Sequence, residues 1–296
     1  MMHTPVLLKE MLSLLLPKDG GVYVDATFGA GGYSKAILES ADCKVCAIDR
    51  DETVTKFYYD LNTKYSDKIR LFIEKFSNIK DLLSNNDIKG IDGVVFDIGV
   101  SSMQLDNGNR GFSFMHDGSL DMSMDSFSHV NASTFVNALH EEEIANTIYN
   151  YGGERHSRKI ARAIVDARKK KLIKTTFELA DIIRSVVFRG KSKIDPATRT
   201  FQAIRIWVND ELGELEKGIK VASEILNENG KLIVVAFHSL EDRIVKNFFK
   251  DLCKSGSADC KKFSLLNKKV IKASVEEVNA NLRSRSAKLR AIQRLS

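Results

Sequence analysis

The sequence Asp25-Ala26-Thr27-Phe28-Gly29-Ala30-Gly31-Gly32-Tyr33 joins a short apolar run, Val22 to Ala26, to a segment of helical length. Glycines in such a loop let the backbone approach a ligand closely, and the N–H groups that open a helix can receive it. A dinucleotide fingerprint would need a third glycine at position 34, where this chain has Ser34. The loop therefore predicts a strand–turn–helix unit that binds a small ligand other than a dinucleotide.

Short apolar runs that end in turn or acidic residues recur outward from this loop, as buried parallel strands do. They are Val22 to Ala26, Lys44 to Asp49, Ile69 to Ile73, Asp92 to Asp97 and Lys231 to Phe237. Segments of helical length lie between the first four, namely Tyr33 to Glu39, Asp51 to Tyr65 and Asn78 to Asn85. This alternation predicts a doubly wound α/β domain.

The alternation stops after Asp97, and the fifth strand comes only after a Gly-, Ser- and Asp-rich stretch and a helical region. The predicted helices of this region are Glu141 to Tyr149, Ser157 to Lys170, Thr176 to Phe188 and Thr198 to Leu226. We expect a discontinuous Rossmann-like domain, residues 1–103 and 210–296, with a helical, basic, substrate-binding domain inserted at 104–209. Because the insertion leaves from the carboxyl ends of the strands, where such folds bind ligands, we expect it to serve as a lid or clamp.

The last part of the chain adds two further runs, Lys262 to Leu266 and Lys288 to Leu295, which predict a terminal antiparallel hairpin. The longest uninterrupted apolar run, Leu232 to Phe237, is far too short to span a membrane. We therefore expect no membrane partner and a cytoplasmic location.

The charge of the chain favours an acidic partner, because its net charge is +6 over 296 residues. Basic residues gather in two places. From Arg155 to Lys174 the only acid is Asp166, and no acid follows Glu277. A solvated helix face is the alternative interpretation of each run, although two separated runs favour RNA.

Metal ligands are the next possibility that the sequence raises, because Cys43 and Cys46 have the spacing of a zinc pair. These two cysteines flank the start of the predicted strand Lys44 to Asp49, and the other two, Cys253 and Cys260, do not form a matching second pair. We therefore expect reduced thiols. Four acidic residues also lack the pattern of a calcium loop: Asp106, Asp117, Asp121 and Asp125. We predict no metal.

Acidic residues at two strand ends indicate the ligand. Asp25 closes the first predicted strand, and Asp49, at the end of the second, can accept hydrogen bonds from both hydroxyls of a ribose. S-adenosylmethionine has a cationic sulfonium and ammonium group and no phosphate, so these acids suit it better than a dinucleotide. A nicotinamide-dependent oxidoreductase is the disfavoured alternative, because of Ser34 and because no hydride-transfer site is evident.

Seven segments, in this order, resemble the MraW-type small-subunit rRNA (cytosine N4)-methyltransferases nearly end to end. They are His3 to Leu8, Asp25 to Ser34, Ala47 to Asp51, Asp97 to Ser102, Arg110 to Phe114, Pro196 to Ala203 and Phe237 to Arg243. The resemblance implies a class I, Rossmann-like, S-adenosylmethionine-dependent methyltransferase with an inserted helical domain. Its substrate would be the N4 amino group of a cytosine in the decoding region of 16S rRNA, within an assembled or partly assembled small subunit.

The resemblance also implies a cofactor site, position by position. Its residues would be Gly31, Gly32, Tyr33, Asp49, Phe76, Asp97 and Gln104. The family usually has histidine where this chain has Tyr33, so we expect the backbone at this position to contact the ligand. The oligomeric state is not predicted.

The reaction itself places demands on the catalytic residues. A cytosine N4 amine is a poor nucleophile, because its lone pair is delocalised into the ring, so the enzyme must align it with the methyl group and accept its hydrogen bonds. Asp97, at the end of the fourth strand, is the first candidate for this acceptor, and its alternative roles are to cap a turn or only to bind the cofactor. Ser101, Ser102 and His238 are further candidates, and a histidine hydrogen-bonded in a turn is the alternative for the last.

Two aromatic residues in the loop after Gly111 have two possible roles. Phe112 and Phe114 either stack on a flipped base or pack in a core. A competing function of another class is a non-catalytic RNA-binding assembly factor on a methyltransferase fold. It is disfavoured by the glycine loop together with Asp49 and Asp97.

Overall fold

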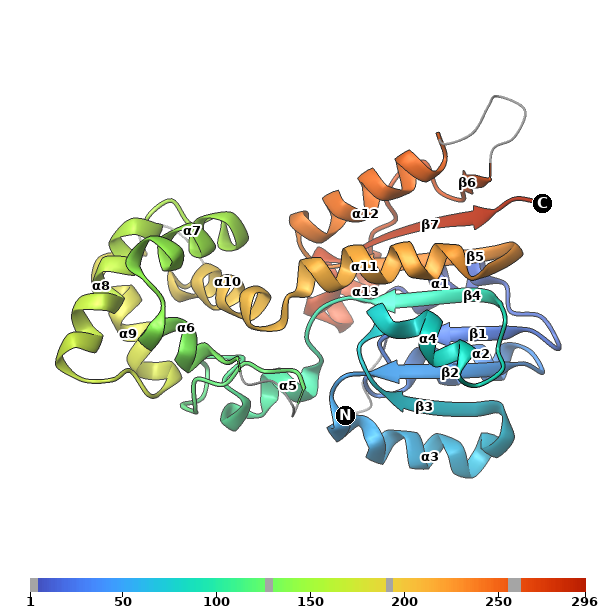
Figure 1. The fold of residues 1–296 in the computed structure, drawn as a ribbon, viewed down its shortest axis with the longest axis horizontal. Helices are drawn as coiled ribbons and strands as arrows, with labels where there is room; N and C mark the ends of the chain where they lie inside the picture. Colours follow the sequence, from blue (N-terminus) through green and yellow to red (C-terminus); the bar gives the residue numbers. More distant parts are fainter. Residues whose placement is uncertain (1–4, 126–129, 190–193, 255–261) are drawn as a thin grey trace. The chain divides into compact units, whose positions relative to one another are not determined.

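A computed structural model of the protein describes residues 5–125, 130–189, 194–254 and 262–296 (Figure 1). His3, Thr4 and Cys260 lie outside these ranges. The chain divides into two compact units, the first formed by Met1–Gly99 with Leu212–Ser296 and the second by Val100–Glu211. The sequence placed the two boundaries after residues 103 and 209. Within the described ranges no helix is both long enough and apolar enough to cross a membrane.

The first unit is built on a seven-stranded sheet with the order β3-β2-β1-β4-β5-β7-β6. Its parallel strands are β1 (Val22–Asp25), β2 (Lys44–Asp49), β3 (Ile69–Ile73), β4 (Ile91–Asp97) and β5 (Leu226–Ala236). Strand β7 (Lys288–Arg294) runs antiparallel to both β5 and β6 (Phe263–Leu265). The structure thus confirms the α/β class, the five parallel strands and the terminal hairpin that the sequence predicted.

Helices and short 3-10 turns connect these strands. The helices are α1 (Leu8–Leu15), α2 (Gly32–Ser40), α3 (Thr55–Tyr65), α4 (Ile79–Ser84), α11 (Glu211–Glu224), α12 (Ser239–Leu252) and α13 (Val275–Ala280). One apolar cluster joins the strands to α4, α11 and α12, because each of these helices turns a buried apolar stripe toward the sheet. Leu83, Ile219 and Phe249 are examples, each 2% exposed or less. This core fixes the carboxyl edge of the sheet.

The second unit is helical, as predicted for the insertion. It contains α5 (Ser102–Asp106), α6 (Ala132–Ala138), α7 (Glu141–Gly152), α8 (Ser157–Lys170), α9 (Thr176–Val186) and α10 (Ala197–Asn209). Apolar residues at helical spacing form its core, for example Ile160 and Ile164 of α8, which are both fully buried.

Two predicted element boundaries were wrong. The segment Thr198 to Leu226 is two helices, because Asp210 takes a left-handed conformation with φ +46° and ends α10. Strand β5 begins at Leu226 and not at Lys231. Its first part includes the left-handed Asn229, with φ +65°, and pairs with β4 through a shifted register. The sequence Asn-Glu-Asn-Gly in this part is typical of a turn, so the strand was predicted to begin after it.

Candidate active site

Three neighbouring strands each end in an aspartate. Asp25, Asp49 and Asp97 are the last residues of β1, β2 and β4. The order β2-β1-β4 makes these strands adjacent, and parallel strands end at the same edge of a sheet (Figure 1). The carboxylates therefore gather where doubly wound folds bind their ligands, next to the glycine loop that follows β1.

Asp25 holds the loop in shape. Its side chain is fully buried, and Oδ2 accepts hydrogen bonds from the backbone N of Ser34 at 3.1 Å and from the Ser34 hydroxyl at 2.7 Å. Oδ1 accepts a further bond from Thr27 N at 3.3 Å. Burial raises the pKa of Asp25 to about 6, although these hydrogen bonds favour the ionised form. All of these partners belong to the protein, so Asp25 stabilises the loop and is not available to bind the ligand directly.

Asp49 links the loop after β1 to the end of β2. Its Oδ2 accepts a hydrogen bond from Gly29 N at 2.8 Å, and Oδ1 accepts one from Asp51 N at 2.9 Å. Burial raises its pKa to about 6. Each carboxylate oxygen can accept two hydrogen bonds, so both oxygens keep capacity for the hydroxyls of a ribose.

Asp97 carries the clearest sign of a ligand site. Its Oδ1 is buried and has no hydrogen-bond partner among the residues that the structure describes. Burial raises its pKa to about 8, and the negative charges of Asp25 and Glu241 act in the same direction. A buried polar atom without a partner is costly in a folded protein and is a recognised mark of functional sites.

The backbone beside these acids is open. Gly29 and Gly99 have left-handed conformations, with φ of +52° and +122°. A Cβ atom on Gly29 would have no described neighbour closer than 3.9 Å, and one on Gly99 none closer than 3.7 Å. Gly32 is different, because a Cβ there would lie 2.2 Å from Pro5 Cγ. Open space thus borders Asp49 and Asp97, whereas Gly32 is needed for close packing.

Tyr33 uses its side chain within the protein. The ring is buried, and its hydroxyl donates a hydrogen bond to the carbonyl oxygen of Val6. The next residue along this N-terminal segment, Leu7, donates from its backbone N to Glu277 Oε1 at 2.8 Å. The backbone of Tyr33 is the part left for a ligand, in line with the role that we expect for it.

Phe76 starts the turn that follows β3. Its ring packs edge-on against Phe96 of β4, with centroids 5.3 Å apart and planes at 88°. A Cβ atom on Gly218 of α11 would lie 2.4 Å from Phe76 Cδ2, so this glycine makes room for the ring. The ring is half-buried, which leaves part of it for a ligand.

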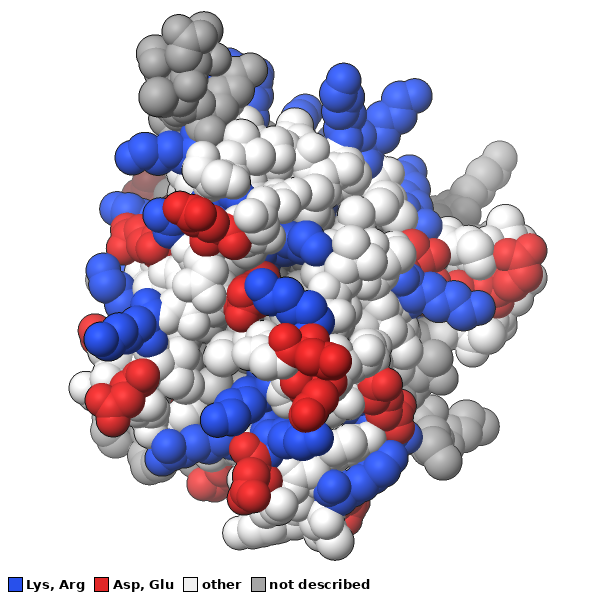
Figure 2. Space-filling view, turned by 90° about the vertical axis from the view of Figure 1, so that its right-hand side faces the viewer, with Lys and Arg blue, Asp and Glu red and all other residues white. Residues whose placement is uncertain are grey.

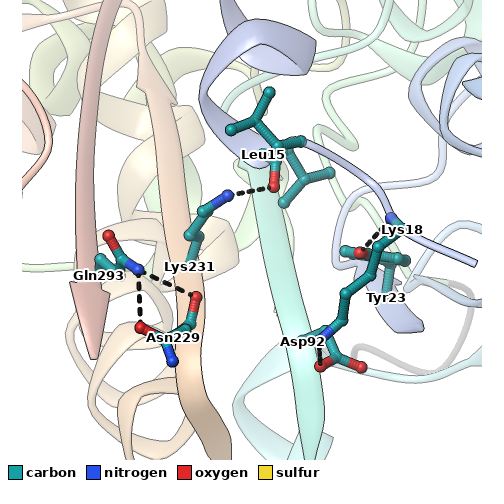
Figure 3. Close-up of a pocket in the computed structure, with 8 residues that line it drawn as sticks. Leu15, Lys18, Tyr23, Asp92, Asn229, Lys231 and Gln293 are labelled. Atoms are coloured by element: carbon teal, nitrogen blue, oxygen red, sulfur yellow. Dashed lines mark hydrogen bonds and ion pairs between the residues drawn. The ribbon is translucent and has the colours of Figure 1, made fainter. Parts of the chain in front are cut away.

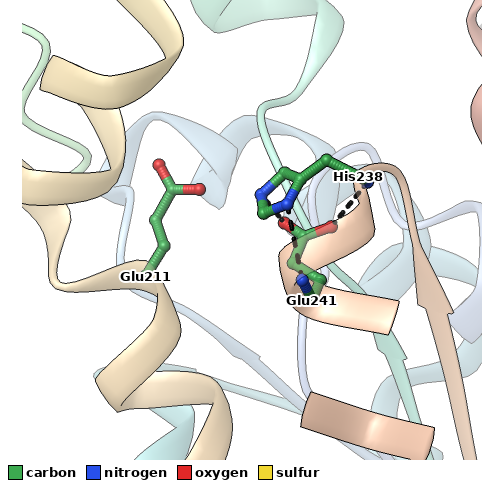
Figure 4. A group of neighbouring side chains, drawn as sticks. All are labelled: Glu211, His238 and Glu241. Carbon is green, nitrogen blue, oxygen red and sulfur yellow. Dashed lines mark hydrogen bonds and ion pairs between the residues drawn. The ribbon is translucent and has the colours of Figure 1, made fainter. Parts of the chain in front are cut away.

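His238 is the N-cap of α12 (Figure 4). Its Nδ1 accepts a hydrogen bond from Glu241 N at 3.4 Å, and its Nε2 lies 2.8 Å from Glu241 Oε1. Glu241 is fully buried, and its Oε2 accepts hydrogen bonds from the backbone N of Phe237 and of His238. Both ring nitrogens therefore face Glu241. This matches the alternative role considered for His238, a histidine that is hydrogen-bonded in a turn.

Three predicted site residues belong to the second unit. Ser101 and Gln104 form a capping box at the start of α5, in which Ser101 Oγ accepts from Gln104 N at 3.2 Å and Gln104 Oε1 accepts from Ser101 N at 3.0 Å. The side chain of Ser102 lies outside the described part of the structure. Their participation in the site stays a prediction.

Phe112 and Phe114 pack inside the second unit. Phe112 is 6% exposed and belongs to its core. Phe114 packs edge-on against Phe201, with centroids 4.9 Å apart. Of the two roles considered, the structure gives both rings the packing role.

A cavity of about 230 Å³ lies in the first unit at the opposite, amino-terminal edge of the sheet (Figure 3). Lys231 Nζ donates to the carbonyl oxygen of Leu15 at 2.8 Å, and Lys18 Nζ lies 2.8 Å from Asp92 Oδ1. Lys231 thus caps the end of α1, and Lys18 and Asp92 form an ion pair, so we interpret the cavity as structural.

The roles of three residues that shape the candidate site were not predicted from the sequence. Glu241 follows His238 at the spacing of a capping box, a signal that could have identified it. Asp25 was predicted to favour the ligand, and its role in holding the loop was not predicted. Thr27, in the middle of the glycine loop, accepts a hydrogen bond from Asp97 N through its hydroxyl. No local pattern predicts this contact between positions far apart in the sequence.

The residues present fit S-adenosylmethionine. With a pKa of about 6, the Asp49 carboxylate is mostly ionised at neutral pH and makes the edge anionic, which suits a cationic ligand. The unpartnered oxygen of Asp97 offers a hydrogen-bonding atom, and the space beside Gly29 and Gly99 leaves room for the ligand. A phosphate would instead meet repulsion from the Asp49 carboxylate.

Comparison with known proteins agrees with this chemistry. The model of the MraW methylase family matches residues 1–295. A protein named "Ribosomal RNA small subunit methyltransferase H" from Wolbachia sp. subsp. Drosophila simulans (strain wRi) is 86% identical over 296 residues, which cover 100% of both chains. Proteins of the same name from Wolbachia pipientis wMel and Ehrlichia canis (strain Jake) are 78% and 61% identical, covering 100% and 99% of this chain and 100% of each relative.

Proposed function

Because the chain belongs to the MraW methylase family, we propose that it methylates the N4 amino group of a cytosine in the decoding region of small-subunit (16S) rRNA. The cofactor is S-adenosylmethionine, which supplies an electrophilic methyl group on a sulfonium. The observation that best supports the proposal is the buried, unpartnered Oδ1 of Asp97 beside the open backbone of Gly99.

The first unit holds the cofactor. Asp49 accepts hydrogen bonds from the ribose hydroxyls, using the acceptor capacity that Gly29 N and Asp51 N leave on its carboxylate. The glycine loop offers its backbone N–H groups, and the half-buried ring of Phe76 adds apolar surface. Asp25 keeps the loop in place through Ser34.

Asp97 acts on the substrate amine. Its carboxylate accepts a hydrogen bond from the amine, which localises the nitrogen lone pair for attack on the methyl carbon. As the new N–C bond forms, the bond between the methyl carbon and the sulfonium sulfur breaks and leaves a neutral thioether. The amine becomes cationic, and its proton passes to the Asp97 carboxylate. The pKa of about 8 suits this step, because a base with a raised pKa takes up a proton more readily.

The second unit binds the RNA. Five basic residues of α8 are exposed: Arg158, Lys159, Arg162, Lys169 and Lys170. Lys169 pairs with Asp166 at 3.2 Å, but an exposed pair of this kind is weak and can be exchanged for a phosphate. The face shown in Figure 2 has basic and acidic side chains interspersed, which makes it a poorer surface for a polyanion than the run on α8.

The substrate form and the site of action extend this proposal. The names of the relatives specify small-subunit rRNA, and the family resemblance implies a target within an assembled or partly assembled subunit. We therefore infer that the substrate is an assembled or partly assembled small subunit, and that the protein works in the cytoplasm.

The test is a methyl-transfer assay with a nucleoside readout. The purified protein is incubated with S-adenosylmethionine and either protein-free 16S rRNA or small subunits, and the digested RNA is analysed by mass spectrometry. We expect N4-methylcytidine, with more from subunits than from free RNA. RNA binding without any methylated nucleoside would favour the non-catalytic assembly factor, and a methyl group on another atom would refute the N4 assignment.

A further inference from the structure

The backbone N of Asp97 donates a hydrogen bond to the hydroxyl oxygen of Thr27 at 2.7 Å. The two residues are 70 positions apart and stand where β1 and β4 end side by side. Asp97 carries the proposed proton acceptor, whereas Thr27 lies in the glycine loop. A single side chain thus connects the cofactor loop to the catalytic strand.

This bond takes the place of a backbone hydrogen bond that β1 does not supply to β4. Ala26 N donates to the carbonyl oxygen of Val95 at 2.9 Å, which is the last backbone bond between β1 and β4. The chain then turns toward β2, because Phe28 N donates to the carbonyl oxygen of Ile48 at 2.9 Å. Asp97 N is left without a backbone acceptor on β1, and the Thr27 hydroxyl takes that place.

On the β5 side, Asp97 lies opposite Val235, and Ile98 N donates to the carbonyl oxygen of Val235 at 2.9 Å. Beyond this bond the chain that follows Asp97 is open. Gly99, two residues later, has φ +122°, and a Cβ atom there would meet nothing closer than 3.7 Å. The carboxylate of Asp97 also lacks a partner at Oδ1 among the described residues. The bond from Asp97 N to Thr27 is therefore the contact that fixes this residue on the β1 side, where the ladder between β1 and β4 has ended.

We propose that Thr27 is a positioning residue for methyl transfer, whose hydroxyl holds the backbone of Asp97 so that the carboxylate faces the substrate amine. This inference rests on the proposed function. A misplacement of about 1 Å at a reacting group can lower a rate roughly 100-fold, so the loss of one such bond has a measurable effect on turnover.

The test compares variants that separate the hydroxyl from the shape of the side chain. Thr27→Val keeps the shape and removes the acceptor, and Thr27→Ser keeps the acceptor. We expect Thr27→Val to lower kcat about 10- to 100-fold and to change KM for S-adenosylmethionine less than about threefold, with Thr27→Ser within about threefold of the wild type. Thr63→Val is the matched control, because its hydroxyl donates to the Tyr59 carbonyl on the exposed side of α3.

A second readout needs neither cofactor nor RNA. Hydrogen exchange at the Asp97 amide, measured by NMR on the ligand-free protein, should be at least about tenfold faster in Thr27→Val and near wild type in Thr27→Ser. The Val95 amide, which belongs to the sheet ladder, serves as the internal reference. If Thr27→Val does not fold, Thr27→Ala is compared with Thr27→Ser in the same way.

The outcomes are distinct. Unchanged exchange at Asp97 in Thr27→Val, unchanged kcat, or an equal loss in Thr27→Ser would each overturn the role of the hydroxyl. A wild-type protein that methylates no RNA would contradict the proposed function instead, while the exchange measurement would still test the bond between Thr27 and Asp97.

Discussion

Ser34 donates two hydrogen bonds to the buried carboxylate of Asp25, from its backbone N at 3.1 Å and from its hydroxyl at 2.7 Å. Position 34 is the one at which a dinucleotide fingerprint requires glycine, and a glycine could donate only the first of these bonds. The residue that breaks the fingerprint is therefore the one that stabilises the charged aspartate under the loop.

Ser34→Ala should destabilise the protein, and more so at high pH. Burial raises the pKa of Asp25 to about 6 in the folded protein. The free energy of unfolding therefore falls as the pH rises from the pKa of Asp25 in the unfolded chain toward 6. Losing the Ser34 hydroxyl raises the folded-state pKa further. We expect a loss of roughly 1 to 3 kcal/mol at pH 8 and a smaller one at pH 5, where the carboxyl is mostly protonated. Urea unfolding at both pH values measures this. Ser40→Ala, at an exposed position of α2, is the control, and an equal loss at both pH values would contradict the explanation.

Asp49→Ala should weaken binding of S-adenosylmethionine. The ribose loses a charged acceptor worth roughly 1.5 to 3 kcal/mol, which corresponds to about 10- to 150-fold in Kd. Isothermal calorimetry compares this variant with Asp60→Ala, an exposed aspartate of α3. Equal affinities would remove Asp49 from the site, provided that thermal melting shows both variants to be folded.

Asp97→Asn should lower turnover by roughly two to three orders of magnitude, because the amide keeps the shape of the side chain but neither holds the charge nor takes the proton. Cofactor affinity should fall much less, since the lost contact belongs to the transition state. Single-turnover methylation beside a cofactor titration separates the two effects. A variant that binds cofactor poorly but transfers methyl normally at saturation would make Asp97 a binding residue, and the acceptor would then be sought among Ser101, Ser102 and His238.

The pH dependence of kcat/KM should follow Asp97. Only the ionised carboxylate accepts the proton, so below the pKa of about 8 the value should rise close to tenfold per pH unit, and it should level off above that pKa. This profile reports the free enzyme, in which no cationic ligand lowers the pKa. A flat profile between pH 6 and pH 8 would show that Asp97 is already ionised or is not the base.

Neutralising Arg158, Lys159 and Lys170 together should reduce the salt dependence of RNA binding. If each contacts a phosphate, the slope of log Kd against log salt should fall by about 2 to 3. Arg168→Gln is the contrasting variant from the same helix, because its guanidinium donates to the carbonyl oxygens of Val136 and Leu139 at 2.8 and 2.7 Å. It should lower stability and leave the slope unchanged. If the triple variant leaves the slope of log Kd against log salt unchanged, the basic run of α8 is a solvated helix face and does not bind RNA.

The parallel strands and their acidic ends could be predicted from sequence because both signals are local. A strand buried on both faces is a continuous apolar run, and Asp49 and Asp97 follow such runs directly. The break at Asp210 was not predicted, because the helical apolar pattern continues across it and the nearest glycine, Gly213, comes three residues later. Aspartate adopts the left-handed conformation more readily than most residues, but this preference alone is too weak a signal to place a break.

The candidate site was predictable only in part for the same reason. Strand ends pointed to Asp49 and Asp97, and the resemblance supplied Phe76 and Gln104. The partners that hold the site lie far away in sequence, as with Thr27 and Asp97, and depend on which strands become neighbours. His238 shows the converse, because a polar residue at a strand end is engaged by a capping partner, Glu241, only three positions later.

The bond from Leu7 N to Glu277 joins residues 270 positions apart, and β4 likewise completes its pairing only with β5, beyond the whole second unit. During synthesis at about 5 to 20 residues per second, the second unit is made before either partner emerges. The nascent first half must therefore wait for many seconds with its sheet edge at β4 uncovered. Because an unpaired strand edge can pair with other chains, this interval of synthesis is the one most open to aggregation.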